Sequence, residues 1–175
     1  IFDEAVFPAG GMAFHHVRLS GGRMSFQRAV FAGGEVSFAD AWFENGHLSF
    51  HHARFEAGTI LFLNATFAAA EVSFAYAAFG GSMVLFNRAR VVGGTLDFGH
   101  AAFTEGRVLF GETSFHAGNV SFARAAFDGT LVDFSDSPAN LGPARFIGCL
   151  PDFSEPASWA RPPLGIPEEA WPTAR

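Results

Sequence analysis

Apolar and polar side chains alternate along this chain, and the alternating stretches recur with a period of twelve residues. Apolar residues two apart, as in Val36-Ser37-Phe38 and Ala41-Trp42-Phe43, have the period of a β-strand, whose alternate side chains point to opposite faces. One column of the repeat is phenylalanine throughout: Phe2, Phe14, Phe26, Phe38, Phe50, Phe62, Phe74, Phe86, Phe98, Phe110, Phe122 and Phe134. A short period held this strictly predicts one structural unit that is stacked many times.

Four further columns complete the unit F-x-x-A-x-F-x-x-G-x-V-x. A small residue such as Ala29 lies three residues after the first Phe, a glycine such as Gly34 eight residues after it, and an aliphatic residue such as Val36 ten residues after it. The second aromatic lies five residues after the first in most units: Phe7, Phe31, Phe43, Phe55, Phe67, Phe79, Phe103, Phe115 and Phe127, with Leu19 and Val91 as apolar substitutes. The two aromatic columns together hold 21 of the 23 phenylalanines.

This unit predicts an all-β protein, a parallel β-solenoid (β-helix) with about 12 residues per coil. Two short strands fit into each unit, with corners at pairs such as Gln27-Arg28 and at Ala32-Gly33 or Glu44-Asn45, where Gly and Asn tolerate left-handed backbone. Eleven or so coils at about 4.8 Å would give a rod about 55 Å long. A sandwich or a set of hairpins also uses short strands, but such folds do not hold a twelve-residue period over this length.

The inward columns predict a narrow core filled by phenylalanine. Because so short a coil has little room to relax, we expect a Phe to lie opposite Ala at one corner and opposite Gly at the other. Stacked coils would then align the Phe rings into ladders with the spacing that aromatic pairs favour. We expect these ladders to be the main source of stability.

The pattern weakens after Phe134, so residues 1–147 are assigned to the solenoid and residues 148–175 to a C-terminal cap and tail that contain Pro and Trp. Ser137 and Ala139 stand where the next small and aromatic residues are expected. Gly142, Ala144 and Phe146 nevertheless retain the register for one last irregular coil.

A short capping helix is expected from Asp152 to Arg161, with Ser154 as its N-cap and a proline in its first turn. Its Trp159 would cover the last Phe, and an extended tail that contains Trp171 would follow.

Both ends of the chain leave alternatives open. The segment from Leu164 to Trp171 could instead serve as a docking peptide for another protein. The chain opens at Ile1 inside a repeat, which is either a boundary made by cloning or processing or an end that pairs with another molecule.

Composition bounds the class of protein without indicating an activity. Hydrophobic residues make up 49% of the chain and charged residues 16%, which is typical of a folded protein. No apolar run reaches the roughly 18 residues of a membrane-spanning helix, so we expect no membrane partner and a cytoplasmic location. Cys149 is the single cysteine, and no neighbour in the sequence supplies a base to activate it, so we expect an inert thiol.

Seven histidines raise the question of a metal site. With one unit per coil, the pairs His15-His16 and His51-His52 would lie about 14 Å apart, and His100 about 19 Å beyond His52. Ligands of a tetrahedral site lie about 2 Å from one ion, so we expect no metal site. No carboxylate pair recurs in a way that suggests a general acid and base, and no nucleophile motif or phosphate-binding loop is present. We therefore expect no catalytic residue, no cofactor and no enzymatic activity.

An outward column follows the first Phe by two residues: Glu4, His16, Arg28, Asp40, His52, Asn64, Tyr76, Arg88, His100, Glu112, Arg124 and Asp136. With one unit per coil, Arg28 would neighbour Asp40, and Arg124 would lie between Glu112 and Asp136, which would support the register. A weaker period of three units also appears, and duplication of a three-coil block would explain it.

The A-x-F triplets and the five-residue aromatic spacing, from about Phe2 to Phe134, resemble the pentapeptide-repeat proteins, whose motif places a small residue two before a central Phe or Leu. The chain departs from that pattern at Leu48, which is followed by a step of two to Phe50. We therefore expect a coil smaller than the four-sided coil of that family, closer to the twelve-residue variants labelled pentapeptide-repeat-containing in actinobacteria. The resemblance implies a right-handed coil.

Two functions that the resemblances suggest are weakly supported by the residues. Some pentapeptide-repeat proteins are DNA mimics that protect or inhibit gyrase, but residues 1–147 carry 13 acids and 9 Arg in scattered columns, and we expect no nucleic-acid partner. Some antifreeze proteins are similar in period and present rows of Thr. The outward columns here read Gly11, Arg23, Glu35, His47, Thr59, Glu71 and Ala13, Ser25, Ser37, Ser49, Leu61, Ser73. They contain no row of Thr, and leucines interrupt the partial row of Ser, so ice binding is weakly supported.

A structural scaffold or protein-interaction module is the function that we expect. Leu61, Leu85 and Leu109 form an outward apolar row, with Val30 and Trp42 on the other face. With one unit per coil, two coils would separate each Leu from the next, so the patch would be discontinuous. A protein partner or a second copy would bind at this face or at the ends of the solenoid.

Overall fold

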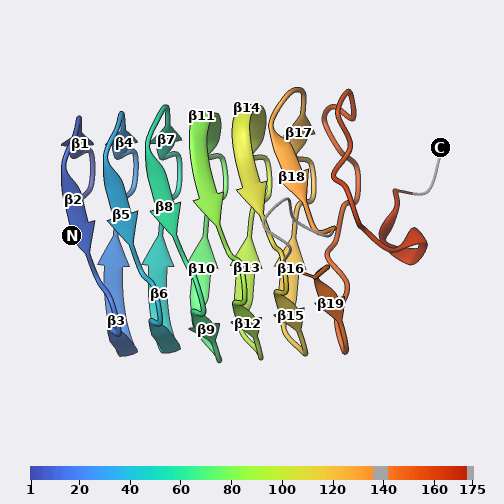
Figure 1. The fold of residues 1–175 in the computed structure, drawn as a ribbon, viewed down its shortest axis with the longest axis horizontal. Coiled ribbons are helices and arrows are strands. Elements are labelled where there is room, and N and C mark those ends of the chain that lie inside the picture. Colours follow the sequence, from blue (N-terminus) through green and yellow to red (C-terminus); the bar gives the residue numbers. More distant parts are fainter. Residues whose placement is uncertain (136–141, 173–175) are drawn as a thin grey trace.

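The computed structural model describes residues 1–135 and 142–172, and it confirms the parallel β-solenoid (Figure 1). The coils stack along the long axis, and two parallel sheets enclose the interior. Sheet A has ten strands: β1 (Val6–Phe7), β2 (Gly11–Ala13), β4 (Val30–Phe31), β5 (Glu35–Ser37), β7 (Arg54–Phe55), β8 (Thr59–Leu61), β11 (Ala78–Leu85), β14 (Ala102–Leu109), β17 (Ala126–Phe127) and β18 (Leu131–Asp133). Sheet B has nine: β3 (Arg18–Ser25), β6 (Trp42–Ser49), β9 (Thr66–Phe67), β10 (Glu71–Ser73), β12 (Arg90–Val91), β13 (Thr95–Asp97), β15 (Ser114–Phe115), β16 (Asn119–Ser121) and β19 (Arg145–Phe146).

Each coil contains about 24 residues, because paired residues lie one coil apart: Val6 pairs with Val30, and Phe31 with Phe55. Two twelve-residue units complete a coil, one supplying strands to sheet A and the next to sheet B. The expected coil of about 12 residues is therefore wrong, and the rod is about half the predicted length. The expectation of a coil smaller than the four-sided coil of the pentapeptide-repeat proteins is wrong as well, because about 24 residues exceed four sides of five residues.

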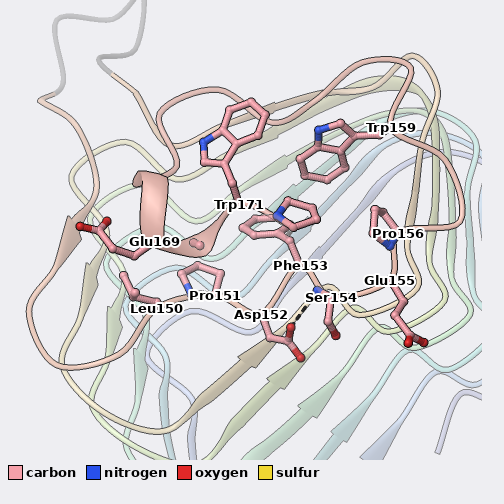
Figure 2. A pocket seen from close by; sticks show the side chains of 12 residues that line it. Leu150, Pro151, Asp152, Phe153, Ser154, Glu155, Pro156, Trp159, Glu169 and Trp171 are labelled. Atoms are coloured by element: carbon pink, nitrogen blue, oxygen red, sulfur yellow. Dashed lines mark hydrogen bonds between the residues drawn. The ribbon is translucent and has the colours of Figure 1, made fainter. Parts of the chain in front are cut away.

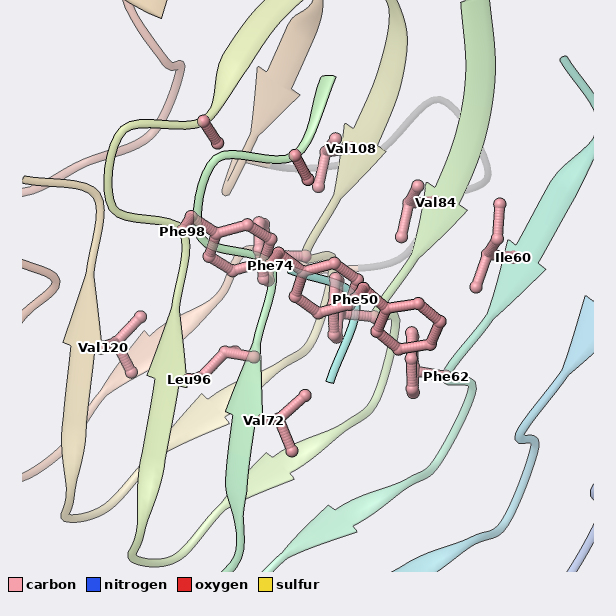
Figure 3. Packing of buried hydrophobic residues seen from close by; sticks show 14 of the residues in the cluster. Phe50, Ile60, Phe62, Val72, Phe74, Val84, Leu96, Phe98, Val108 and Val120 are labelled. Atoms are coloured by element: carbon pink, nitrogen blue, oxygen red, sulfur yellow. The ribbon is translucent and has the colours of Figure 1, made fainter. Parts of the chain in front are cut away.

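Two ladders of phenylalanine rings interlock at the centre of the coil (Figure 3). Within one ladder, Phe50 stacks on Phe74 with ring centroids 4.8 Å apart and an angle of 6° between the planes. Across the coil, Phe50 meets Phe62 edge to face, at 6.3 Å and 90°. Both arrangements suit the quadrupole of an aromatic ring. A pair of units thus gives each central ring stacked neighbours in its own ladder and edge contacts with the other.

Aliphatic side chains from the two sheets lie on either side of these rings (Figure 3). Val84 belongs to sheet A and Val72 to sheet B, and both are buried. The second aromatic column is also internal, and Phe55 stacks on Phe79 at 4.9 Å. Ala53 is fully buried as well, so the inward orientation of the small, aromatic and aliphatic columns is confirmed.

The glycine column has a different cause from the one expected. At Gly34, φ is +73°, and a Cβ would lie 1.9 Å from the carbonyl oxygen of Gly10 in the preceding coil. The missing side chain therefore makes room for backbone and not for a phenylalanine ring. Ala70 and Thr130, which stand in the same column, are fully buried.

Left-handed backbone also occurs at the first corner, at a position that glycine never occupies. Its second residue has φ between 54° and 61° in eleven successive units: Glu4, His16, Arg28, Asp40, His52, Asn64, Tyr76, Arg88, His100, Glu112 and Arg124. A backbone hydrogen bond, such as that from the N–H of Ala29 to the carbonyl of Phe26 at 3.1 Å, closes this turn. Residues other than Gly rarely adopt this conformation because it is unfavourable. The contacts with the neighbouring coils must therefore hold each corner in it.

The corner after Phe134 contains seven extra residues. The N–H of Ala144 donates to the carbonyl of Phe134, a bond that elsewhere joins residues three apart, as between Thr113 and Phe110. Phe146 then pairs with Phe115, so the repeat continues beyond the insertion. The expected columns at Ser137 and Ala139 lie outside the described residues.

The prediction of a helix from Asp152 to Arg161 is wrong, because this segment continues the solenoid instead. Asp152 forms a parallel bridge with Ser121, past residue 147 where the solenoid was expected to end. Phe153 lies at the ladder position, where it is 1% exposed and stacks on Phe122 at 4.9 Å. Trp159 packs edge to face on Phe127 at 5.1 Å and on Phe153 at 5.8 Å, so its expected role as a cover for the final rings is confirmed.

Proline fits into the C-terminal coil, which follows Phe146, because the hydrogen bonds between this coil and the one below do not need the N–H groups that proline lacks. The N–H groups of Asp152 and Leu164 donate back to Val120 and Val132. Since hydrogen bonding alternates along a strand, the nitrogens of the preceding residues, Pro151 and Pro163, face away from the coil below. The one helix in the described residues is the 3₁₀ turn η1 (Glu168–Ala170).

Candidate interaction surfaces

The leucine row is continuous on the outer face of sheet A. Leu61 pairs with Leu85, and Leu85 with Leu109, so consecutive residues lie one strand spacing apart, about 4.8 Å. The expectation that two coils separate them is wrong, because one coil holds two units. Leu61 and Leu85 are partly exposed, whereas Leu109 is 9% exposed.

A second outward column of sheet A runs beside this row: Gly11, Glu35, Thr59, Met83, Arg107 and Leu131. Met83 is 38% exposed and extends the apolar surface. Glu35 lies one coil before Thr59, and Arg107 lies one coil after Met83. Within the described part of the chain, neither Glu35 nor Arg107 forms an ion pair. We call this surface, with the leucine row, the apolar face.

The matching column of sheet B is polar: Ser25, Ser49, Ser73, Asp97, Ser121 and Asp152. These side chains support the adjacent turn. Ser73 Oγ accepts a hydrogen bond from the N–H of Ala75 at 3.2 Å, and Asp97 Oδ1 accepts one from the N–H of Gly99 at 2.8 Å. This local use of the serine column weighs against an ice-binding surface.

The corner residues pair with partners one coil away, not with those expected from one unit per coil. Arg28 contacts Glu4 at 3.4 Å, in place of the expected Asp40. Arg88 Nε donates to Glu112 Oε2 at 2.7 Å, and this bond contributes most to lowering the pKa of Glu112. These pairs are exposed, so each contributes little to stability.

The corner row of Glu4 and Arg28 also contains Arg124, whose Nε lies 3.3 Å from Glu155 Oε2. The expected partner Glu112 belongs to the opposite corner, and Asp136 lies outside the described residues. In the same row, Tyr76 stacks between His52 and His100, with ring centroids 5.0 and 4.6 Å apart.

The histidine pairs lie on opposite corners, because His16 aligns with Asp40 and His52 with Arg28 when two units make a coil. The described residues contain no group of three or more His, Cys, Asp or Glu that could hold a metal ion. Burial raises the pKa of the Cys149 thiol, which disfavours the reactive thiolate.

His51 is expected to make the protein less stable as the pH falls through 6.5, the ordinary pKa of a histidine side chain. Burial, and then the charge of His52, lower the pKa of His51 below its ordinary 6.5, and Arg28 adds to this effect while Asp97 opposes it. The unfolded chain therefore binds this proton at a higher pH than the folded chain. The free energy of unfolding is therefore unaffected by this group well above 6.5 and decreases as the pH falls through 6.5 toward the lower pKa of the folded state.

Urea unfolding at a series of pH values should show this loss, and His51→Asn should reduce it. The same pH dependence in both proteins would contradict the assignment to His51.

A cavity of about 1040 Å³ opens at the C-terminal end of the rod (Figure 2). Phe153, Trp159 and Trp171 line it together with Asp152 and Glu155. Sequence reasoning placed both tryptophans in the cap and tail and missed the cavity, because Trp171 lies outside the repeat. The signal that was available is the gathering of two Trp and several acids after Phe146.

In the part of the chain that the structure describes, no helix is both long enough and apolar enough to span a bilayer.

Comparisons with known proteins leave the family open. The sequence matches no protein-family model and no curated protein, and the fold matches no solved structure.

Proposed function

We propose that this protein is a non-enzymatic interaction module, a rigid β-solenoid that associates with a second copy through the apolar face of sheet A. The continuous row of Leu61, Leu85 and Leu109 carries the proposal. Covering the partly exposed Leu61 and Leu85 together with Met83 removes apolar area from water, which favours association. The coil would be right-handed and of pentapeptide-repeat type, as the resemblance implies.

The charges beside the row favour a second copy as the partner. Glu35, Thr59, Met83 and Arg107 occupy four consecutive coils, with opposite charges at the two ends. If two copies pack face to face about a two-fold axis along the strands, the order of one column is reversed against the other. Glu35 of each copy then faces Arg107 of its mate, and Thr59 faces Met83.

Light scattering on the purified protein should show a dimer, and Leu85→Glu should convert it to a monomer because the carboxylate would be buried in the interface. Trp42→Ser is the matched control, since Trp42 is an exposed apolar residue (44%) of sheet B. It should leave the dimer intact.

The charge pair provides a second test. Glu35→Arg should weaken the dimer, and the double variant Glu35→Arg with Arg107→Glu should restore it, because the reversed pair is again complementary. A wild-type protein that stays monomeric at about 100 μM, a concentration at which even a weak interface would be populated, would overturn the proposal.

The ion pairs weigh against the alternative of a gyrase-directed DNA mimic. Glu44 contacts Arg18 at 3.0 Å, and Glu112 contacts Arg88 at 2.7 Å. These cations reduce the negative charge that mimicry of a duplex requires. Protection or inhibition of gyrase in a supercoiling assay would favour the mimic instead.

A further inference from the structure

The cavity at the C-terminal end has two aromatic walls set at a steep angle (Figure 2). The rings of Trp159 and Trp171 have centroids 5.9 Å apart and an angle of 76° between their planes. Trp159 is held by its edge-to-face contacts with Phe127 and Phe153, so this wall is anchored to the Phe core. Trp171 is 45% exposed and leaves ring surface open to a ligand.

The charged groups that line this cavity are all acidic. Asp152, Glu155 and Glu169 line the cavity, and its twelve described lining residues include no Arg, Lys or His. Arg124 reaches Glu155 from outside this lining, while Asp152 accepts a hydrogen bond from the backbone of Ser154 at 2.8 Å. The cavity therefore favours a positively charged ligand.

Aromatic walls and carboxylates together suit one kind of cation. A divalent metal ion needs several convergent ligands, and the described residues provide no such cluster. An alkylated ammonium group is weakly hydrated, its methyl groups pack on ring faces, and its charge is attracted by the ring quadrupole and by nearby carboxylates. The cavity volume, about 1040 Å³, is at the upper end of small-molecule sites and leaves room for an organic body beside the charge.

We propose that this cavity binds a small organic cation that carries an alkylated ammonium group. The ammonium group lies in the angle between Trp159 and Trp171, and Glu169 and Asp152 supply the opposing charge. The site is independent of the apolar face, which lies on the outer side of sheet A.

Calorimetric titration of the intact protein with benzyltrimethylammonium and with choline tests the proposal. Both probes should bind, and 3,3-dimethyl-1-butanol, the neutral analogue of choline, should bind at least about ten-fold more weakly because it lacks the charge. Equal binding of choline and its neutral analogue, or no binding of either cation up to about 50 mM, would overturn the proposal.

Matched tryptophan variants locate the site. Trp171→Leu should weaken benzyltrimethylammonium binding about ten-fold, because leucine keeps an apolar side chain and removes the ring. Trp42→Leu changes a residue of similar exposure (44%) on sheet B and should leave binding unchanged. Circular dichroism should show that both variants keep the fold. Equal loss in both variants, or in neither, would overturn the assignment.

The carboxylates and the ligand class are tested in the same assay. Glu169→Gln should weaken binding several-fold at low ionic strength, and the effect should shrink as salt is added. A trimethyllysine peptide that binds at least about ten-fold tighter than benzyltrimethylammonium would overturn the small-molecule assignment in favour of a peptide.

Discussion

Replacing Phe74 with alanine is expected to lower the free energy of unfolding by about 3–5 kcal/mol. Phe74 is fully buried and stacks on Phe50 and Phe98, at 4.8 and 4.9 Å. It also meets Phe62 and Phe86 edge to face. The alanine variant would lose these contacts and leave a cavity that the stacked coils on either side cannot close. Urea unfolding followed by circular dichroism measures the loss.

Phe2→Ala is the matched control, because Phe2 belongs to the same ladder but is 37% exposed. It has a stacked partner on one side, Phe26 at 4.9 Å. We expect a loss of about 1–2 kcal/mol, smaller than that for Phe74. An unchanged melting temperature for Phe74→Ala would contradict the ladder as the main source of stability.

Gly58→Ala is expected to destabilise the protein by about 2–4 kcal/mol, through two separate effects. The backbone of Gly58 has φ of +83°, which disfavours any side chain. A Cβ there would also lie 2.4 Å from the carbonyl oxygen of Gly34 and 2.7 Å from the carbonyl carbon of Gly33. The coil would have to move away from its neighbour, which would weaken the hydrogen bonds between them. Urea unfolding again measures the effect.

Gly10→Ala separates the two effects. Gly10 stands in the same column with φ of +91°, but nothing lies within 4 Å of a Cβ built on it. Its replacement should cost only the backbone term, about 1–2 kcal/mol. Similar losses at Gly10 and Gly58 would show that contact between coils does not explain the glycine column.

The fold class and the inward columns could be predicted because both follow from the repeat and from the alternation of side chains within each short strand. Val36, Phe38 and Phe43 are buried as their alternation predicts, since a strand sends alternate residues to opposite faces. The turn at Gln27-Arg28 follows from the position of the strands on either side. Strand pairing depends on contacts between distant residues, so the same pattern fits one or two units per coil.

The pattern of the outward residues nevertheless contains a signal for the length of the coil. Ser49, Ser73 and Asp97 follow one another on sheet B, while Leu61 and Leu85 follow one another on sheet A. Sorted by single units, these two columns merge into one irregular row. Sorted by pairs of units, they separate into a polar row on sheet B and a row on sheet A in which three leucines are consecutive, between Ser37 and Asp133. The discontinuity of the leucines then disappears.

The C-terminal coil was missed because seven residues interrupt the register before it. The step from Phe146 to Phe153 equals the step from Phe31 to Phe38, and this equality would have identified another coil. Proline and Ser154 suggested a helix, but burial of Phe153 in the ladder outweighs that local preference. The cavity could not be predicted, because it depends on how Trp171 folds back beside Trp159 after the repeat has ended.

The closure of one coil by two equivalent units allows the core and the surface to evolve by different steps. Loss or gain of a single twelve-residue unit keeps every Phe in phase, but it transfers all later outward columns to the opposite sheet. Leu85 would then follow Ser-bearing strands instead of Leu61. The weak period of three units corresponds to one and a half coils, so its copies lie on opposite sides of the rod. Duplication of single units can thus rearrange the outer faces of the two sheets without changing the core.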